Sequence, residues 1–584
     1  MPMTSSDAEL RLLTEAREWA AQDPDPATKA SLLELVRLVE DGDPVARQEL
    51  DDSFRGTLQF GTAGLRAALG PGPNRMNRVV VRRAAAGLAV FLLDAVAKAA
   101  PGTRPRAVVG YDARHNSDAF AAETAAIFTA AGIETFLLPA PLPTPLLAYA
   151  VRALDCDGGV MVTASHNPPQ DNGYKVYLGR HAVASDGEGA QIVAPYDAEI
   201  AARISAVGPL ESITLAEGGW TVLDGSLAAG YERATAALTM PDRFPARDLK
   251  IVLTPLHGVG GGTALDVLKA AGFTDVTVVA EQAEPDPDFP TVSFPNPEEP
   301  GALDLALEAA AQLDADIVIA NDPDADRAAV AAKDPDSGAW RMLRGDEVGS
   351  LLGAHMVARL SDGQAGAEAD GRGVFANSIV SSRLLARIAA AAGFAHEETL
   401  TGFKWISRVP GLVYGYEEAL GYCVAPDQVK DKDGISAAVL IAELAAAAKA
   451  AGKTVFDTLD ELYLQHGLHA SDQLSIRVAD LGLLDAMMNR LRVSPPESFG
   501  QSAVEVFTDL AEGSTQLPPT EGLLYITRNL TRVIIRPSGT EPKLKCYLEV
   551  IHQAGSAAEL PAARQAARAS LDEVLHDVSE ALGL

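Results

Sequence analysis

Strands and helices alternate in the first third of the chain, and this alternation limits the fold more than any other feature. Short apolar runs at 107–110 and 135–138 predict buried strands, and the segment 119–131 between them predicts a helix. A second helix over 146–153 leads to a third apolar strand at 159–163. A helix between two strands returns the chain to the end of the sheet where the first strand began, so the next strand runs in the same direction. This order therefore predicts parallel βαβ units.

The same order begins again twice further along the chain. Strand 249–254 is followed by the glycine-rich turn 258–263 and a helix, and strand 373–377 is followed by a helix from about Ile379. The turn lacks the third glycine of a G-x-G-x-x-G dinucleotide motif, so we interpret it as a close helix–strand turn. The chain therefore contains three α/β modules of similar order.

The two ends of the chain differ from these modules. From about Ser471 strands and helices mix less regularly, which predicts a smaller α+β domain, and a helical extension precedes the first module. A chain of 584 residues is too long for one hydrophobic core. The predicted fold class is α/β, with three similar α/β domains that contain mixed sheets and a C-terminal α+β domain. The predicted boundaries are 1–55 for the extension, 56–245, 246–345 and 346–468 for the modules, and 469–584 for the last domain.

Composition excludes several classes of function. The formal charge of −31 argues against a nucleic-acid partner, because binding to a phosphate backbone requires basic surface. The three cysteines, Cys156, Cys423 and Cys546, have no paired spacing and predict neither a disulfide framework nor a zinc site. The N-terminus lacks a basic region followed by an apolar core, and no apolar stretch is long enough to span a bilayer. We therefore expect a cytoplasmic protein that does not bind membranes.

A serine follows the apolar strand 159–163 directly. Ser165 is followed by Pro168 and Pro169, which fix backbone φ angles, and by an Asn172-Gly173 pair that predicts a turn. Most loop serines only cap a helix or a turn. A serine held at the end of a buried strand on a stiff loop is also how a nucleophile is presented, and two further segments favour that interpretation.

Three carboxylates at alternate positions follow the apolar strand 317–320. Asp322, Asp324 and Asp326 can converge on one hard cation, which takes oxygen ligands. An EF-hand is excluded, because the sixth position from Asp322 is Arg327 instead of glycine. The alternative is a solvated acidic turn. The end of a strand is where open α/β sheets place their ligands, and Arg327 is suited to bind an anion at the same metal, so we favour a metal site.

An arginine-containing loop follows a strand-like run at 531–535. Arg536 supplies a guanidinium fork, Ser538 and Thr540 supply hydroxyl groups, and Gly539 lets backbone N–H groups approach a ligand closely. These are the elements of a phosphate-binding loop. A Ser-Gly turn in a hairpin is the alternative, but it does not account for the arginine.

These three loops, in this order, resemble those of the α-D-phosphohexomutase family, the phosphoglucomutases and phosphomannomutases. Residues 60–66 are similar to the family's N-terminal motif, 415–421 to its sugar-binding loop, and 401–406 to a further motif. The resemblance runs from about residue 60 to 547 and implies a heart-shaped, four-domain fold in which each domain contributes one loop to a central cleft. It also implies a monomer or a homodimer.

The resemblance implies a role for each motif residue. Ser165 is the residue that carries the transferred phosphoryl group, Lys175 a general acid or base, and His166 and Arg66 position the phosphoryl group. Mg²⁺ is held by Ser165, Asp322, Asp324 and Asp326. The substrate is bound by Arg327, Lys404, Glu417, Arg536, Ser538, Gly539, Thr540 and Lys543, and the basic residues of the motifs predict a positive cleft in an acidic protein.

Lys175 and the sugar loop each raise a question. A lysine is a poor base at neutral pH unless burial or neighbouring cations lower its pKa, and Arg66 and Arg327 are candidate neighbours. Many phosphoglucomutases carry Glu-x-Ser in the sugar loop, whereas here Ala419 stands at the serine position. The resemblance therefore implies the reaction more firmly than it implies the sugar.

We expect a phosphoglucomutase that works through a glucose 1,6-bisphosphate intermediate and activator. Phosphopentomutase, phosphomannomutase and glucose-1,6-bisphosphate synthase are the alternatives. A phosphatase would use the same serine and aspartates, but the second phosphate-binding loop favours transfer over hydrolysis. A sugar-phosphate sensor would not need the nucleophile and the metal ligands.

Overall fold

The computed structural model describes residues 5–61, 64–335, 337–361, 373–478, 481–513, 517–537 and 543–584. It divides into two compact units, each built from two stretches of chain. One unit contains Met1–Lys333 and Gly421–Glu443, and the other contains Asp334–Leu420 and Leu444–Leu584.

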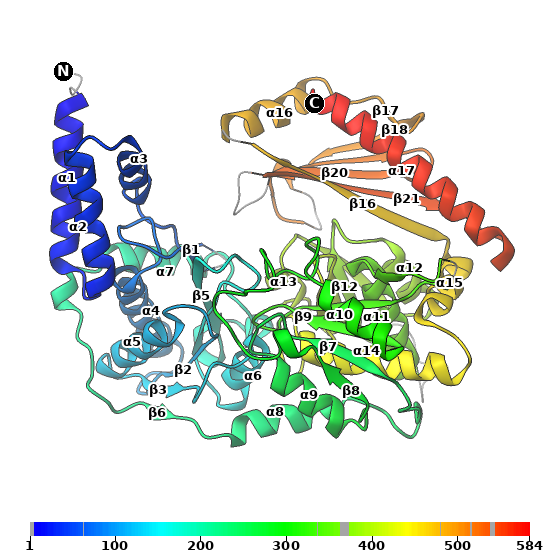
Figure 1. Cartoon of the computed structure of the whole chain (residues 1–584), viewed down its shortest axis with the longest axis horizontal. Helices are drawn as coiled ribbons and strands as arrows, with labels where there is room; N and C mark the ends of the chain where they lie inside the picture. The colour runs from blue at the N-terminus through cyan, green and yellow to red at the C-terminus, as the bar shows by residue number, and fades with distance from the viewer. Residues whose placement is uncertain are drawn as a thin grey trace. The chain divides into compact units, whose positions relative to one another are not determined.

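Three helices form the N-terminal extension in the first unit: α1 (Ser5–Gln22), α2 (Pro26–Glu40) and α3 (Pro44–Ser53). The carboxylates of Asp25 and Asp43 accept hydrogen bonds from the first backbone N–H groups of α2 and α3, and a proline at the start of each helix needs no such partner. The helices pack against one another (Figure 1). Their shared core contains Leu13, Ala16, Leu32, Val36 and Leu50.

The first α/β module contains a six-stranded mixed sheet in the order β1-β5-β4-β2-β3-β6. Its strands are β1 (Leu65–Ala68), β2 (Arg106–Tyr111), β3 (Glu134–Leu137), β4 (Gly158–Val162), β5 (Asp171–Leu178) and β6 (Thr221–Val222). Its helices are α4 (Arg78–Ala99), α5 (Ser117–Ala130), α6 (Thr144–Ala153), α7 (Tyr196–Ser205) and α8 (Ser226–Ala236). Strand β2 pairs in parallel with β3 and β4, so the predicted βαβ units are confirmed.

The Asn172-Gly173 pair does not form the predicted turn. Both residues lie in β5, which pairs antiparallel with β4 and with β1, and Gly173 lies opposite Arg66. A Cβ atom on Gly173 would lie 2.5 Å from the carbonyl oxygen of Thr163, so glycine is needed for close strand approach and not for a turn. As a result Lys175 lies on a strand of the sheet, opposite Met161, and not in the serine loop.

The second module lies in the same unit and has a mixed sheet. Strand β7 (Ile251–Thr254) pairs in parallel with β8 (Val276–Val278) and β9 (Ile317–Asn321), and β10 (Ala328–Lys333) pairs antiparallel with β9. This unit also contains α9 (Gly261–Ala270), α10 (Asp304–Leu313), β15 (Gly421–Cys423) and the start of α14 (Gly434–Ala450).

The glycine-rich turn after β7 packs against the aspartate loop. The backbone N–H of Val259 donates a 2.8 Å hydrogen bond to the carbonyl of Pro323. A Cβ atom on Gly258 would lie 2.4 Å from the Cα of Pro323, whereas one on Gly262 would meet nothing within 4 Å. The turn therefore supports the loop that carries Asp322, as a close helix–strand connection does.

The second unit contains the third module. Strand β12 (Val374–Ser378) pairs in parallel with β13 (Ala395–Thr399) and with β14 (Leu412–Glu417). This unit also contains β11 (Trp340–Met342), α11 (Gly345–Leu360), α12 (Leu384–Ala391), α13 (Phe403–Ile406) and α15 (Val455–His466).

The helix predicted from about Ile379 begins later, at Leu384. Ser378 and Ser381 both donate to Oε2 of Glu418, at 3.0 and 2.9 Å, and the backbone N–H of Ser382 donates to Oδ1 of Asp346 at 2.7 Å. These side-chain contacts hold the segment after β12 as a turn, because serine side chains compete with helical hydrogen bonding.

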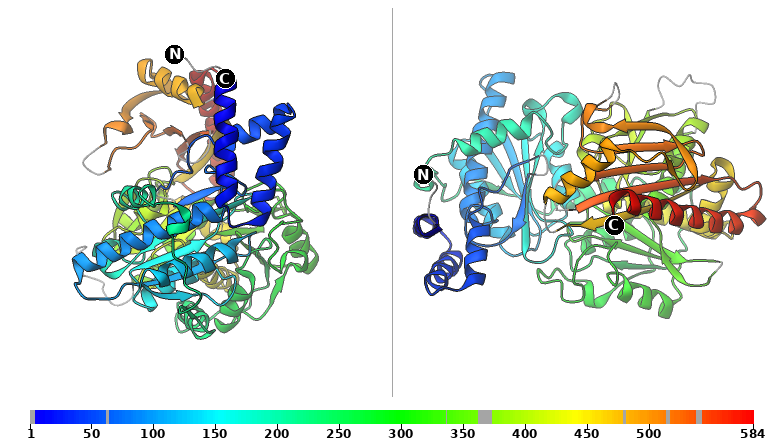
Figure 2. Two further views of the ribbon diagram at one scale, coloured as in Figure 1. Left: turned by 90° about the vertical axis from the view of Figure 1, so that its left-hand side faces the viewer. Right: turned by 90° about the horizontal axis from the view of Figure 1, so that it is seen from above.

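The C-terminal α+β domain has a six-stranded antiparallel sheet in the order β16-β21-β20-β19-β18-β17. Its strands are β16 (Leu468–Arg477), β17 (Ser498–Phe499), β18 (Ser502–Asp509), β19 (Leu523–Thr527), β20 (Arg532–Pro537) and β21 (Lys543–His552), and its helices are α16 (Leu481–Val493) and α17 (Leu560–Leu582). Helix α17 lies along β16 and β21 (Figure 2). Together with the three modules, this sheet confirms the predicted fold class.

Short 3-10 helices occur in the connections of both units. They are Arg180–Ala182, Ser185–Gly187, Leu210–Ser212, Ala280–Gln282, Leu510–Glu512 and Ala557–Glu559. Within the described residues, no single helix is long and apolar enough to cross a membrane, and only α14 with α15, bent by 89° at their junction, reaches that length and composition as a pair.

Replacing Gly258 tests the support of the aspartate loop. In Gly258→Ala the methyl group overlaps the backbone of Pro323, so we expect a loss of about 1–3 kcal/mol in the free energy of unfolding, measured by urea denaturation. Gly262→Ala is the matched control, because the same change in open space removes only backbone freedom of the unfolded chain. Equal effects in the two variants would contradict the packing argument.

Burial of Asp346 makes the stability depend on pH. Burial raises the pKa of Asp346 to about 6, so the fold prefers the protonated acid; its contribution is complete below the unfolded pKa of about 4 and is lost as the pH rises through about 6. From pH 5 to pH 7.5 the free energy of unfolding of the wild type should fall by about 1.4 kcal/mol relative to that of Asp346→Asn. The interval from pH 5 to the pKa is about one unit, and one unit corresponds to that energy. A pH-independent difference in urea denaturation would show that Asp346 titrates normally.

Candidate functional site

Ser165 lies directly after β4 in a strained backbone conformation. Its φ angle is 51°, in the left-handed region that residues with a side chain seldom adopt, and its side chain is buried. The Oγ hydroxyl of Thr163 accepts the N–H of Ser165 at 2.9 Å and holds the turn. The Ser165 hydroxyl donates to Oδ2 of Asp322 at 2.6 Å and lies 3.2 Å from Nδ1 of His166. One hydroxyl is thus fixed between a carboxylate and an imidazole.

Arg114 holds the serine loop through backbone carbonyl groups. Its buried guanidinium donates to the carbonyl oxygens of Ser165 and Asn167, each at 2.5 Å, and to that of Pro168 at 2.7 Å. Oδ2 of Asp112 lies 3.4 Å from its Nε atom. A planar guanidinium with five N–H donors suits several acceptors at once, whereas lysine does not. The sequence analysis missed Arg114, because nothing in its local pattern distinguishes it from a surface arginine.

The three aspartates form a compact, buried cluster after β9. One carboxylate oxygen from each of Asp322, Asp324 and Asp326 lies within 4.8 Å of the others. Oδ1 of Asp324 accepts no hydrogen bond from the described residues, and Oδ1 of Asp326 accepts none either and lies 3.8 Å from Nε of Arg327. Buried carboxylate oxygens without hydrogen-bond donors are unfavourable, so this donor set fits a hard divalent cation.

Two lysines from other parts of the unit compensate the aspartates. Nζ of Lys175 lies 2.7 Å from Oδ2 of Asp324 and 2.8 Å from Oδ2 of Asp326, and Nζ of Lys432 lies 3.1 Å from the latter. Burial opposes ionisation of Asp326, but Lys175, Lys432 and Arg327 outweigh it and hold its pKa well below the ordinary value.

The pKa of Lys175 moves in the direction opposite to the one a general base needs. Burial favours the neutral amine, but Asp324 and Asp326 outweigh it and raise the pKa. The sequence predicts that Arg66 and Arg327 lower this pKa, and this prediction is wrong, because the two carboxylates raise it. Lys175 is therefore a charged ammonium.

His166 and Arg66 border the same cluster. Burial, followed by the charges of Arg327 and Arg66, lowers the pKa of His166 well below its ordinary value, so the imidazole is neutral. Arg66, on β1, donates from Nη1 to Oδ1 of Asn167 at 3.2 Å. Burial lowers the pKa of Arg66, and the guanidinium stays charged because its ordinary pKa is so high.

Thr144 is a further residue that the sequence analysis missed. Its hydroxyl donates to Oδ2 of Asp324 at 2.7 Å, and its backbone N–H donates to the carbonyl of Asp324 at 2.9 Å. Thr144 begins α6, so the start of a helix in the first module fixes the loop of the second. Gly434 acts in the same way, because its N–H donates to the carbonyl of Ala325.

The remaining predicted residues belong to the second unit. Lys404 lies in α13, Glu417 ends β14, Arg536 lies in β20 and Lys543 begins β21. Ser538, Gly539 and Thr540 lie outside the described residues, as do positions 62 and 63 of the N-terminal motif.

Tyr547 on β21 connects the sugar loop with the arginine. Burial raises the pKa of the Tyr547 phenol, Glu418 and Glu417 raise it further, and Arg536 opposes them. Within this unit the carboxylates at the end of β14 and the guanidinium of β20 therefore act on one side chain.

The chain matches four consecutive domain families. These are described as phosphoglucomutase/phosphomannomutase alpha/beta/alpha domain I at residues 57–203, domain II at 230–338, domain III at 344–466, and the C-terminal domain at 500–566. The chain therefore belongs to the phosphoglucomutase/phosphomannomutase family, the α-D-phosphohexomutases. It is an isomerase of the phosphomutase class.

Three relatives span nearly the same length. The chain is 46% identical to a probable phosphomannomutase of Haemophilus influenzae, over 81% of this chain and 93% of the relative. It is 34% identical to the phosphopentomutase of Homo sapiens, over 94% and 92%. It is also 34% identical to the phosphoglucomutase of Staphylococcus haemolyticus, over 86% and 91%.

Removing one carboxylate tests the metal site. We expect Mg²⁺ at about one hundred times its dissociation constant to raise the midpoint of thermal unfolding of the wild type by a few degrees, because a ligand of the native state stabilises it by about 2.7 kcal/mol at that concentration. Asp326→Asn should lose this increase, and Glu308→Gln, an exposed change on α10, should keep it. An increase that survives in Asp326→Asn would place the cation elsewhere.

Proposed function

We propose that this protein is a phosphosugar mutase that interconverts glucose 1-phosphate and glucose 6-phosphate. In this reaction Ser165 carries a phosphoryl group and transfers it to the free hydroxyl of the sugar monophosphate. The resulting bisphosphate returns its other phosphoryl group to Ser165. The observation that carries the proposal is the Ser165 hydroxyl, held 2.6 Å from Asp322 within a cluster of three buried carboxylates.

The proposed cation is Mg²⁺, held by Asp322, Asp324, Asp326 and an oxygen of the phosphoserine. When bound, it neutralises charge on the transferring phosphoryl group. The hard oxygen donors and the carboxylate oxygens that accept no hydrogen bond support this choice. Ser165, fixed by Thr163 and by the Arg114 clamp, keeps the reacting oxygen in one place, which lowers the entropic cost of transfer.

Lys175 is the proposed general acid. The attacking sugar hydroxyl gives up its proton as its oxygen bonds to phosphorus, and the serine oxygen takes up a proton as its own bond to phosphorus breaks. The raised pKa keeps Lys175 protonated, which is the state that a proton donor must have. Arg66 and Arg327, the cations beside the cluster, are proposed to bind the phosphoryl oxygens, and neutral His166 to orient the serine oxygen.

The second unit is proposed to bind the rest of the substrate. Glu417 accepts hydrogen bonds from sugar hydroxyls, and Lys404, Arg536 and Lys543, with Ser538, Gly539 and Thr540, bind the phosphate that does not react. Glu417 and Arg536 both act on the pKa of Tyr547, and this supports the assignment. A carboxylate that can accept hydrogen bonds from sugar hydroxyls and a guanidinium that can donate to a phosphate are then in one part of the unit.

Mannose and ribose phosphates are the second candidates. They are favoured by the probable phosphomannomutase at 46% identity and by the phosphopentomutase that matches 94% of this chain. Ala419 in the sugar loop offers no hydroxyl, so it gives glucose no contact that the other sugars lack. A glucose-1,6-bisphosphate synthase activity is the third candidate.

A comparison of three sugars tests the proposal. With Mg²⁺ and a trace of the matching bisphosphate, we expect kcat/KM for glucose 1-phosphate to exceed those for mannose 1-phosphate and ribose 1-phosphate by about tenfold, a difference of about 1.4 kcal/mol in transition-state binding. A preference for mannose or ribose would overturn the choice of sugar and keep the reaction. Release of inorganic phosphate at the rate of turnover would overturn transfer in favour of hydrolysis.

Ser165→Ala separates the chemistry from the fold in the same assay. It removes the reacting oxygen, so we expect turnover to fall to background while far-UV circular dichroism and substrate binding are kept. Gly262→Ala again serves as control, because its Cβ atom meets nothing. Turnover retained in Ser165→Ala would contradict the covalent mechanism.

A further inference from the structure

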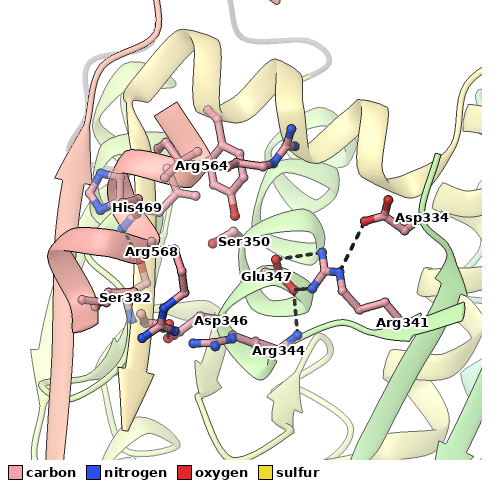
Figure 3. Close-up of a pocket in the computed structure, with 17 residues that line it drawn as sticks. Asp334, Arg341, Arg344, Asp346, Glu347, Ser350, Ser382, His469, Arg564 and Arg568 are labelled. Carbon is pink, nitrogen blue, oxygen red and sulfur yellow. Dashed lines mark hydrogen bonds and ion pairs between the residues drawn. The ribbon is translucent and has the colours of Figure 1, made fainter. Parts of the chain in front are cut away.

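A cavity apart from the Ser165 site lies in the unit formed by 334–420 and 444–584. It has a volume of about 330 Å³ and is lined by the start of α11, the start of β16 and the middle of α17 (Figure 3). Of the described residues that we assign to phosphoryl transfer or substrate binding, none lines it. The volume is sufficient for a small metabolite.

Two buried polar atoms in its wall have no hydrogen-bond partner among the described residues. They are Oγ of Ser350, on α11, and Nε2 of His469, on β16. Ser350 is 1% exposed and His469 6% exposed, and Figure 3 shows Ser350 at the cavity. Nδ1 of His469 lies 3.2 Å from Oε1 of Glu549 and donates to that carboxylate, which leaves Nε2 for a ligand. A ligand hydroxyl suits both atoms.

Four guanidinium groups gather at the same cavity in a chain of net charge −31. Those of Arg341 and Arg564 are paired with Glu347 and Asp460. Arg568 and Arg344 share one carboxylate, that of Asp472, with distances of 2.5 Å and 3.7 Å. Arg568 is also paired with Asp572, at 2.5 Å, so Arg344 is the guanidinium best placed to meet an anion, with Arg568 beside it.

Arg344 makes the weakest of these contacts. The 3.7 Å ion pair with Asp472 is too long for a hydrogen bond, and within the described part of the chain its guanidinium donates none. Its side chain is 46% exposed. It therefore has donors available at the entrance of the cavity, where a planar fork can bind a phosphate or a carboxylate.

We propose that this cavity binds a small organic phosphate that carries hydroxyl groups. The phosphate group lies at Arg344 and Arg568, and a hydroxyl group lies at Ser350 and His469. The walls formed by Leu384, Leu468 and Leu571 exclude water around the carbon chain. Binding at this cavity does not depend on the proposed function.

The cavity is connected to the sugar loop through Asp346, which also lines it. Oδ1 of Asp346 accepts the Tyr416 hydroxyl at 3.0 Å and the N–H of Ser382 at 2.7 Å, while Ser471 donates to Oδ2 at 2.9 Å. Tyr416 immediately precedes Glu417. An occupant that moves Asp346 therefore acts on the position of Glu417, and this second statement rests on the proposed function.

Isothermal titration calorimetry of the full chain with 3-phosphoglycerate tests the site. We expect one molecule to bind per chain, with affinity reduced about tenfold in Arg344→Gln, because a hydrogen bond between charged groups is lost. Ser350→Ala should weaken binding severalfold with an unchanged midpoint of thermal unfolding, since its hydroxyl has no partner to lose. Arg528→Gln, an exposed arginine paired with Glu505 in the same unit, should bind as the wild type does.

Parallel titrations with inorganic phosphate and citrate separate the contributions. Inorganic phosphate that binds as tightly as 3-phosphoglycerate and is insensitive to Ser350→Ala overturns the hydroxyl contact, and citrate that binds more tightly overturns the choice of phosphate. No binding, or binding unaffected by Arg344→Gln, overturns the site. A change in the KM for the sugar phosphate on adding 3-phosphoglycerate, absent in Arg344→Gln, supports the coupling between the cavity and Glu417. If the chain is inactive on every sugar, the proposed function is overturned, whereas the calorimetric result on the cavity still holds.

Discussion

The fold of the first unit depends on one arrangement of buried charges. Asp322, Asp324 and Asp326 are all removed from water, and isolated buried carboxylates are strongly destabilising. The ammonium groups of Lys175 and Lys432 compensate Asp324 and Asp326. Because these lysines come from β5 and from the segment after β15, the charges can be compensated only when three distant parts of the chain are in register. The site and the fold are therefore stabilised by the same contacts.

The backbone around this cluster is fixed as firmly as the side chains. Arg114 binds three carbonyl groups of the serine loop, and Thr144 binds both the side chain and the carbonyl of Asp324. The glycine-rich turn approaches Pro323 so closely that a methyl group at Gly258 would overlap it. Such support keeps the left-handed conformation of Ser165, which a free loop would relax. A pre-organised serine oxygen is what phosphoryl transfer requires.

In the second unit, the buried carboxylate of Asp346 connects several elements. It joins α11 to the turn after β12 and to Tyr416 on β14, and it keeps a raised pKa because it is buried beside Glu418 and Glu549. The same residue lines the cavity with Arg344 and Ser350. One side chain thus takes part in the stability of the module, in the position of the sugar loop and in the proposed second site.

The sequence by itself determined the elements that depend on local pattern: the parallel βαβ order, the three α/β modules, and the loops of Ser165 and Asp322 at the ends of apolar strands. Arg536, expected after its strand, lies within β20 instead. The prediction from sequence was wrong where a local preference competed with a distant partner. Asn172-Gly173 forms strand because β1 and β4 pair on both sides, α12 starts late because Glu418 and Asp346 bind the serines before it, and the carboxylates raise the pKa of Lys175. The roles of Arg114, Thr144 and Lys432 were decided only by the tertiary structure, since each acts on residues tens to hundreds of positions away and such convergence leaves no periodic pattern in the chain.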